Sequence, residues 1–342
     1  MQASMSNAPP PPTAPPSRWK RFRGWLEVAG CQLAFRLLPC LPRPMVRALA
    51  VVAGSLFHWF DRRSRRVALE NLQAAFGDQY TDQQRDRIAR RSACHFALTF
   101  FDLFWARHLS SENLERYVKF EGLEILQQHD QAGGVIGICI HYGAYELAAY
   151  ACGFRGIEAT MLARDFKNPG VTALFTQARE ASGHHIIPRE KALRRMLGVL
   201  RKGQTVGLMM DLALKLHEGG FAQDCFGLKM NATAIHGALH LKTGRPLLPI
   251  SNEPLPDGRR LVRLHEPLRF PPGSTAEQVS QGCWNFFEEQ VRAKPELWLW
   301  SYRHFRYKPS NTDRFYPWYA HEAEVFDERV EAAEGRQLNR EP

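Results

Sequence analysis

The chain reads GGVIGICIHYGAYE from residue 133 to residue 146. The run from Val135 to Ile140 is short, rich in β-branched residues and preceded by glycines, which is typical of a buried strand in a parallel sheet. His141 follows this strand directly, and Glu146 falls near the first turn of the helix that we expect next. Ligands bind at the carboxyl ends of strands in open α/β sheets. The stretch therefore predicts that His141 stands at a ligand-binding edge.

His141 and Glu146 also have the residue types of a general base and its orienting acid. A carboxylate that holds one ring nitrogen leaves the other nitrogen free to take a proton from a hydroxyl. The alternative is a strand-end histidine and a helix-start glutamate that serve only packing and capping. The spacing alone does not separate these two interpretations.

The rest of the chain alternates strand-like and helical segments. Strand-like runs are expected at residues 117–120, 135–140, 159–163, 184–187, 205–211 and 246–250, with helical patterns between them and a long loop after residue 211. Repeated alternation predicts an α/β fold with a mainly parallel central sheet flanked by helices. We expect four parts: a disordered, proline-rich tail at 1–17, basic amphipathic helices at 18–66, a catalytic domain at 67–309 and a polar tail at 310–342.

Two further polar residues follow predicted strands. Arg164 comes after the strand at 159–163, and its charged fork suits an oxyanion or a phosphate; a structural ion pair is the alternative. Asp211 ends the run at 205–211, where a buried carboxylate indicates either a site or a satisfied polar network. Parallel strands bring both residues to the edge that carries His141.

Several short motifs occur in a fixed order along the chain. They are Arg65-x5-Asn71-Leu72-x3-Phe76, the H-x4-E of 141–146, the segments 164–169 and 207–211, Phe226-Gly227 and PELWLWSYR at 295–303. This ordered set resembles the bacterial lipid A biosynthesis late acyltransferases, of the lauroyl and myristoyl transferase type. That family moves a fatty acyl chain from acyl carrier protein to a hydroxyl of a lipid A precursor. The resemblance covers roughly Arg65 to Lys308.

The resemblance implies a glycerolipid acyltransferase-like fold and a role for each matching residue. His141 is the implied general base, oriented by Glu146, while Arg164, Asp211 and the Phe226-Gly227 pair are implied to contact substrate. Phe226-Gly227 would shape an acyl-binding wall, with a simple turn as the alternative. The family commonly continues after the strand-end aspartate with glutamine, where this chain has Leu212. Acyl carrier protein is the implied donor and a glycolipid the acceptor, with no cofactor and no metal.

The cysteines indicate no metal site and no disulfide framework. The chain has 7 cysteines without a C-x2-C pair, which favours a reducing compartment. Cys139 lies two residues before His141, so a Cys-His acyl intermediate is an alternative to direct transfer. A small buried residue is the interpretation that we prefer for Cys139.

Positive charge is concentrated near the N-terminus. The formal net charge is +10, and residues 17–66 hold eleven Lys/Arg against Glu27 and Asp61, which leaves nine of the ten net charges there. Aromatic and aliphatic residues are interleaved with these cations, a mixture that suits an anionic membrane surface. A basic helical hairpin packed on the catalytic domain is the alternative. No nucleic-acid-binding motif accompanies the segment, so we expect no nucleic acid partner.

No uncharged stretch in the same segment is long enough to span a bilayer. Its longest uncharged stretch, residues 48–60, has thirteen residues, against the ~18 to 20 that a spanning helix needs. Better-known family members resemble single-span proteins, so this chain departs from them. We expect one or two interfacial helices, no signal peptide, and a peripheral or monotopic location at the cytoplasmic face of the inner membrane.

A second basic segment lies in the catalytic domain. Residues 189–202 form a predicted helix with Lys191, Arg194, Arg195, Arg201 and Lys202, which suits an acidic carrier protein; a solvated helix face is the alternative. Three other functions stay open beside lipid A acylation. They are transfer to another lipid, such as an ornithine- or glycerol-based acceptor, hydrolysis of an acyl ester, and a non-catalytic role as a basic membrane-binding protein.

Overall fold

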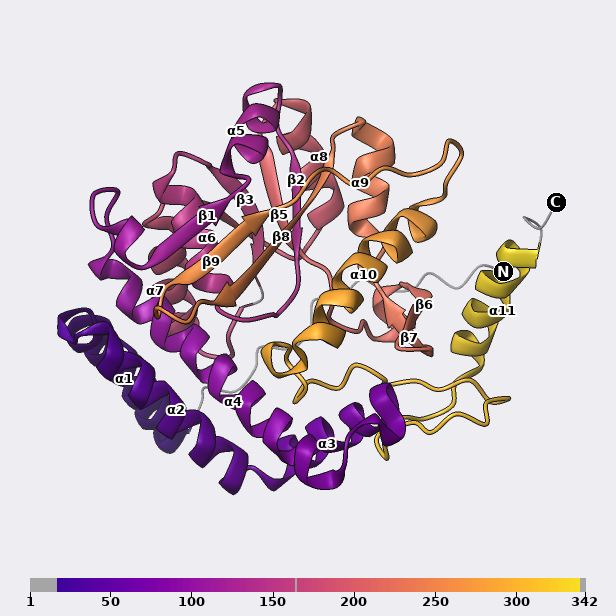
Figure 1. Ribbon diagram of the computed structural model, residues 1–342, viewed down its shortest axis with the longest axis horizontal. Coiled ribbons are helices and arrows are strands. Elements are labelled where there is room, and N and C mark those ends of the chain that lie inside the picture. The colour runs from indigo at the N-terminus through magenta and orange to yellow at the C-terminus, as the bar shows by residue number, and fades with distance from the viewer. Residues whose placement is uncertain (1–16, 164, 339–342) are drawn as a thin grey trace, which may run out of the picture.

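Seven strands form the central sheet of the computed structural model, which describes residues 17–163 and 165–338 (Figure 1). The strands are β1 (Val118–Glu121), β2 (Ile136–Cys139), β3 (Ala159–Ala163), β4 (His185–Pro188), β5 (Thr205–Met209), β8 (Leu247–Pro254) and β9 (Arg260–Leu264). Their order is β1-β9-β8-β2-β5-β3-β4. The expected mainly parallel sheet is confirmed, because five of the six strand pairs are parallel.

The sheet departs from the sequence-based expectation at one edge. Strand β9 was not predicted, and it pairs antiparallel with β8, so that β1 and β9 run against the other five strands. The residues around Leu261 and Arg263 do not show whether this strand runs parallel or antiparallel to its neighbour. The direction follows from the short turn between Pro254 and β9. This reversal brings the amino end of β9 to the edge where β2, β5 and β8 end.

Helices cover both faces of the sheet, and each face has its own hydrophobic core. One layer holds α8 (Ala192–Arg201), α9 (Ile235–Thr243) and α10 (Ala276–Ala293). The other holds α4 (Asp82–Trp105), α5 (Leu123–Gln131), α6 (Tyr145–Phe154) and α7 (Pro169–Glu180). Helix α4 begins with a capping box in which Thr81 and Gln84 bind each other's backbone, and Thr275 and Gln278 do the same for α10.

The predicted long loop after Asp211 contains a β-hairpin. Strands β6 (Phe221–Cys225) and β7 (Leu228–Ala232) pair antiparallel through a two-residue turn at Phe226 and Gly227. Both turn residues have positive φ, +55° and +76° respectively. The turn that was kept as the alternative for Phe226-Gly227 is therefore present. The two strands beside it were not predicted, because a bulky Phe in the left-handed region is uncommon, whereas Asn-Gly or Gly-Gly is the usual hairpin signal.

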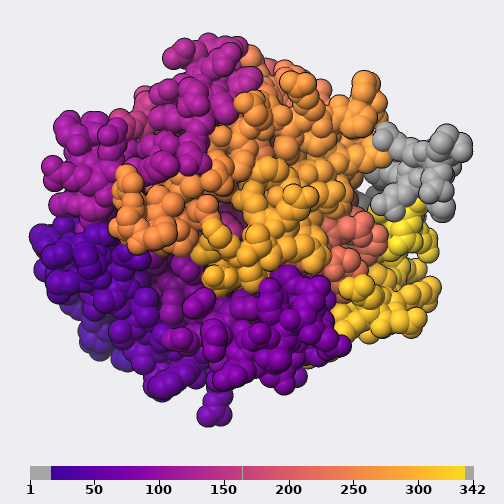
Figure 2. All heavy atoms as spheres, viewed as in Figure 1, coloured from indigo at the N-terminus to yellow at the C-terminus, as the bar shows by residue number. Residues whose placement is uncertain are grey.

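The N-terminal segment folds into three helices, α1 (Arg18–Leu37), α2 (Arg43–Phe60) and α3 (Arg62–Phe76), and the first two form one side of the molecule (indigo in Figures 1 and 2). Helix α2 packs closely on α4, since a Cβ at Gly54 would lie 2.4 Å from the Cα of Cys94. Asn168 caps α7 and also donates to Gly24 O on α1 at 2.8 Å. Helix α3 continues through the expected boundary between residues 66 and 67 without a break.

The outer faces of α1 and α2 leave many large apolar side chains in solvent. Their exposed members are Trp19, Phe22, Trp25, Leu26, Leu33, Leu37, Met45, Leu49, Val51, Val52, Leu56, Phe57, Trp59 and Phe60. We call these side chains the outer apolar face. The opposite sides of α1 and α2 pack on α7 and α4. Among the described residues, no helix combines the length and the apolar character that crossing a bilayer requires.

The structure describes a C-terminal helix but almost none of the N-terminal tail. The predicted disordered tail at 1–17 lies outside the described residues except for Ser17, whose side chain accepts a hydrogen bond from Lys20 N and caps α1. At the other end, α11 (Glu324–Leu338) docks on β6, and Phe326 is fully buried. The segment predicted as a solvated polar tail thus has a buried apolar contact.

Candidate active site

The register of β2 and β5 brings His141 and Asp211 together. Cys139 pairs with Met209 as the last residue of both parallel strands, so the residues two positions further on lie opposite each other. The Nδ1 atom of His141 lies 2.8 Å from Asp211 Oδ1, and the backbone N–H of His141 donates to Asp211 Oδ2 at 3.0 Å. A carboxylate from a neighbouring strand end therefore holds the histidine twice.

Asp211 is fully buried and its two oxygens are engaged. Beside the contacts to His141, it accepts a hydrogen bond from the indole Nε1 of Trp298 at 2.8 Å. Burial works against the charge of Asp211, yet the facing His141 ring and the hydrogen bonds from His141 and Trp298 hold its pKa below the usual value. Asp211 is therefore an ionised hydrogen-bond acceptor in the folded protein.

The ionised partner determines the tautomer of His141. An ionised carboxylate can only accept, so Nδ1 carries a proton and donates it to Asp211. In the neutral form of the ring Nε2 then carries the lone pair, and within the described residues Nε2 makes no hydrogen bond. The His141 side chain is 15% exposed, and the ring of Tyr145 packs edge-on against it at 5.0 Å. This arrangement can accept a proton from a hydroxyl that approaches the open side of the ring.

The loop after His141 is held by side chains from two elements, β8 and α4. Asn252 on β8 donates to Tyr142 O at 2.8 Å and accepts from Ala144 N at 2.6 Å, while Thr99 on α4 donates to Gly143 O at 3.1 Å. Gly143 has a φ of +60°, and a Cβ there would lie 2.5 Å from Asn252 Oδ1. Only glycine fits this position, so the geometry of the loop is fixed by its neighbours.

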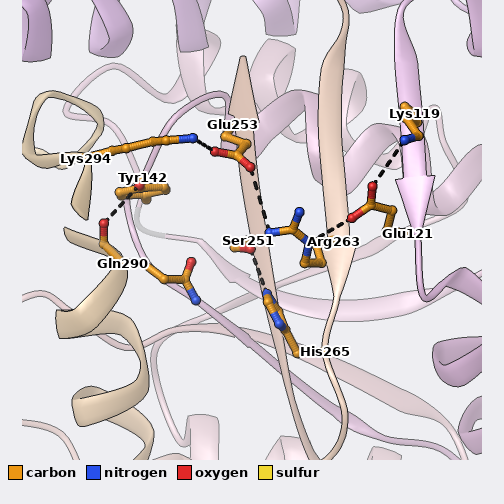
Figure 3. A network of polar contacts seen from close by, with 9 residues as sticks. All are labelled: Lys119, Glu121, Tyr142, Ser251, Glu253, Arg263, His265, Gln290 and Lys294. Atoms are coloured by element: carbon orange, nitrogen blue, oxygen red, sulfur yellow. Dashed lines mark hydrogen bonds and ion pairs between the residues drawn. The ribbon is translucent and has the colours of Figure 1, made fainter. Parts of the chain in front are cut away.

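A surface network braces the same loop from the antiparallel edge of the sheet (Figure 3). Lys294, just after α10, pairs with Glu253 on β8, the residue next to Asn252. Arg263 on β9 bridges Glu253 and Glu121, and Tyr142 donates to Gln290 O at 3.2 Å. Each exposed ion pair contributes little by itself, because solvent screens it. Their shared effect is to fix the α10 end against the strand that holds the His141 loop.

Glu146 does not occupy the position that its spacing from His141 predicted. Its carboxylate is bound by Arg179 of α7, with Nη2 to Oε1 at 2.6 Å and Nε to Oε2 at 3.1 Å. The expected Glu146–His141 hydrogen bond is absent among the described contacts, because Asp211 already occupies Nδ1. Burial opposes the charge on Arg179, but Glu146 raises the pKa of Arg179 above its usual value. The pair ties the first turn of α6 to α7.

Cys139 is unsuited to act as a nucleophile in this structure. Burial raises the pKa of its thiol to about 12, and the sulfur lies 3.6 Å from Leu208 O, to which it donates. A thiolate, the reactive form, is therefore disfavoured at neutral pH. The geometry favours direct transfer over a Cys-His acyl intermediate.

Arg164 lies outside the described residues, directly after β3. The next residues, Asp165 and Phe166, begin the lining of an open hollow of about 1000 Å³ that runs along α7. The order of strands puts the end of β3 beside the end of β5, on the edge that carries His141 and Asp211. The hollow adjoins the β3 end rather than the His141 ring, so we assign it no chemistry.

Phe226 lies behind the site rather than on its surface. Its side chain is 2% exposed, and its ring packs against Phe76, Trp298 and Trp300 at centroid distances of 5.5 to 5.7 Å. The role of a wall in contact with an acyl chain does not fit a ring so covered. Asp211 is also sealed from solvent, so its contact is with His141 and not with free space. Gly227 is exposed at the hairpin turn.

The motif at residues 65–76 and the motif at residues 295–303 pack together behind Asp211. Asn71 on α3 donates to the backbone oxygens of Trp300 and Tyr302, each at 2.7 Å, and Ser92 donates to Trp298 O. His304, fully buried, stacks on Trp298 with ring centroids 4.1 Å apart, and burial lowers its pKa to about 4. Trp298 therefore packs in the core and also orients Asp211 through its hydrogen bond.

Sequence reasoning did not find Asn252, Arg179 or the orienting contact of Trp298. Arg179 lies inside a helix and has no signal of its own. Asn252 lies in the middle of an otherwise ordinary strand, where only a buried polar residue hints at a partner.

A buried carboxylate, a histidine with one free ring nitrogen and a strand-end position form an arrangement that can take a proton from a hydroxyl. The chain belongs to the bacterial lipid A biosynthesis acyltransferases, because the model of that family matches residues 17–307. This confirms the resemblance and the acyltransferase class, whose reaction needs an acyl donor and a lipid acceptor.

Two curated relatives are named as acyltransferases of lipid A biosynthesis. A lipid A biosynthesis lauroyltransferase of Escherichia coli K12 is 25% identical over 300 residues, covering 86% of this chain and 95% of the relative. A lipid A biosynthesis acyltransferase of Haemophilus influenzae is 22% identical over 271 residues, covering 77% and 83%. Among solved structures, a 1-acyl-sn-glycerophosphate acyltransferase of Thermotoga maritima matches with a TM-score of 0.33 and 19% identity, over 81% of this chain and 98% of that one.

Proposed function

We propose that this protein transfers a fatty acyl chain from acyl carrier protein to a hydroxyl of a lipid A precursor, with His141 as the general base. The observation that carries the proposal is the His141–Asp211 pair, with Nε2 of the ring free at the edge of the sheet, in a member of this family. A free imidazole nitrogen at this place has the chemistry that an acceptor hydroxyl requires.

The transfer follows in two proton movements. Nε2 of His141 takes the proton of the acceptor hydroxyl as its oxygen attacks the thioester carbonyl, and the new C–O bond forms. The resulting imidazolium faces the ionised Asp211, whose negative charge stabilises it. As the C–S bond breaks, its electron pair stays on sulfur, and the imidazolium gives the proton to the departing thiolate, which leaves as the thiol. A well-placed general base of this kind contributes roughly 10²- to 10⁴-fold in rate.

The other predicted site residues have supporting parts in the proposal. Glu146, bound by Arg179, fixes the helix that follows the His141 loop. Arg164, the residue after Ala163 in the sequence, is proposed to stabilise the developing oxyanion or bind a phosphate of the substrate, for which an always-charged planar fork is suited. Phe226 belongs to the aromatic layer behind Trp298, which in turn donates to Asp211, and Gly227 completes the turn that carries Phe226.

The outer face of α1 and α2 is proposed to lie on the anionic cytoplasmic surface of the inner membrane. It combines exposed indole and phenyl rings with exposed cations of α1 such as Arg18, Lys20 and Arg21. Rings of this kind enter the interface while cations meet the headgroups. A lipid acceptor would then reach the enzyme from the surface on which the enzyme rests.

Purified protein, acyl carrier protein loaded with a labelled acyl chain and separate acceptor lipids test the proposal. The expected product is the lipid A precursor with one added acyl chain. Acylation of an ornithine- or glycerol-based lipid instead would move the function to the alternative acceptor. Release of free fatty acid without any acylated lipid would point to hydrolysis and contradict the proposal.

A further inference from the structure

Helix α8 has one apolar face and one basic face. Met196 and Leu200 are buried and Leu193 and Leu197 are partly buried, at the spacing of one helical stripe. The opposite stripe consists of exposed Lys191, Arg194, Arg195, Gly198, Arg201 and Lys202, which we call the α8 basic stripe. The apolar face is fully explained by packing on β5 and α9, whereas the basic stripe faces solvent.

The cations of the α8 basic stripe lack partners within the described chain. None of its five Lys and Arg side chains makes an ion pair or a hydrogen bond with a described residue, although basic side chains elsewhere pair with Asp or Glu, such as Arg179 and Arg263. Five like charges within the twelve residues from Lys191 to Lys202, on α8 and its two caps, repel one another. They create a field that attracts an acidic surface and raises its association rate.

The stripe begins at the edge of the sheet that carries His141. Strand β4 ends at Pro188, which pairs with Ala163, the last residue of β3. Arg189 follows, 3.8 Å from Glu218 in the segment after Asp211. The ends of β2, β5, β3 and β4 are consecutive in the sheet, so the start of α8 continues the row that contains His141 and Asp211.

The stripe is distant from the outer apolar face of α1 and α2. In Figure 1, α8 lies beside α9 at the upper side of the sheet, while α1 and α2 lie at the lower left. Its neighbours on the same helix layer expose Lys242 but no cluster of aromatic rings. A surface with cations and without exposed rings suits an acidic soluble protein better than a bilayer.

We propose that the α8 basic stripe is the docking surface for the acidic acyl carrier protein, which delivers its thioester to the sheet edge at His141. The proposal rests on the proposed function for the identity of the donor. The carrier binds on the opposite side of the molecule from α1 and α2. The contacting side chains are Lys191, Arg194, Arg195, Arg201 and Lys202.

Gly198 offers a test that adds a charge without removing a contact. It lies in the middle of the stripe, and a Cβ there would meet no atom within 4 Å. Gly198→Glu places a carboxylate among the five cations, and Gly198→Gln is the matched neutral control. Both replace glycine inside a helix by a better helix former, so both variants are expected to fold.

The experiment measures binding and turnover for the same proteins. Binding is followed by fluorescence anisotropy of labelled holo acyl carrier protein, and turnover with two donors, the acyl carrier thioester and the same chain on pantetheine. For Gly198→Glu we expect about five-fold weaker carrier binding or more, a matching rise in KM for the carrier thioester, and unchanged turnover with acyl-pantetheine. Gly198→Gln should match the wild type in all three.

Equal carrier binding by the Glu and Gln variants overturns the docking inference, whatever the turnover. A Glu variant that loses affinity for anionic phosphatidylglycerol vesicles, but not for the carrier, overturns it in favour of a membrane contact. If the carrier binds in the charge-dependent way but neither thioester supports acyl transfer, the docking surface stands and the proposed function fails.

Discussion

Asp211 lies directly behind His141, 2.8 Å from its Nδ1, although the two residues are 70 positions apart in the chain. The buried carboxylate also accepts the backbone N–H of His141 and the indole N–H of Trp298. It therefore determines the orientation of the ring, its tautomer and the stability of the imidazolium that proton transfer creates.

Replacing Asp211 by Asn tests this arrangement. An amide can donate to Nδ1 and so favours the tautomer with the proton on Nε2, which cannot accept one from a hydroxyl. We expect kcat to fall by roughly 10²- to 10⁴-fold. Initial rates with saturating substrates give the value, and near-UV circular dichroism checks the fold. A folded Asn variant with wild-type kcat would contradict the role of Asp211.

Glu146 and Arg179 should behave as one unit. Removing either partner leaves the other buried charge alone, so we expect Glu146→Gln and Arg179→Gln each to lower the free energy of unfolding by about 3 kcal/mol. The double variant should lose much less than the sum, with a coupling of about 1 to 3 kcal/mol in urea unfolding. Simple additivity would mean that the two side chains do not depend on each other.

His304 should make the protein acid-labile in a defined window. Its folded pKa, about 4, lies below the unfolded value of 6.5, so the unfolded chain binds the extra proton first. Stability is complete above about pH 6.5 and is lost as pH falls towards 4, by about 3 kcal/mol for this residue. His304→Gln, which keeps a donor for Leu299 O, should flatten this part of the pH profile of urea midpoints. An unchanged slope would show that another group titrates there.

The outer apolar face should control membrane binding without controlling the chemistry. We expect Trp19, Trp25 and Trp59 changed together to Ser to weaken binding to phosphatidylglycerol vesicles by at least roughly ten-fold, because burying each large ring contributes up to about 1.5 to 3 kcal/mol. Turnover on a detergent-solubilised acceptor should stay at the wild-type level. Vesicle sedimentation measures the first effect; undiminished sedimentation would place the membrane contact elsewhere.

The strand that ends at His141, the parallel sheet and the strand-end position of Asp211 could be predicted because apolar runs and chain alternation are local signals. The partner of His141 could not. It depends on β2 lying next to β5 in a register that pairs Cys139 with Met209, and neither strand order nor register can be read from the segments themselves. Glu146, five residues after His141, was the nearer candidate in sequence for the partner of the ring. In the structure its carboxylate binds Arg179 of α7 instead.

The hairpin at 221–232 and the docked α11 escaped prediction for a related reason. Phe226 adopts a left-handed turn that its own type disfavours, and aromatic packing on Trp298 and Trp300 accompanies it. Phe326 is one apolar residue in an acidic segment, and only the neighbouring β6 shows that it is buried.

The central claim is that the imidazole of His141 drives acylation of a lipid A precursor, and mass spectrometry of the lipid product tests it most directly. Wild-type protein, given acyl carrier thioester and the precursor, should shift the precursor mass by one acyl group. His141→Ala, shown by circular dichroism to be folded, should leave that mass unchanged over the same time. The acylated product appearing at the wild-type rate from the His141→Ala protein would contradict the account.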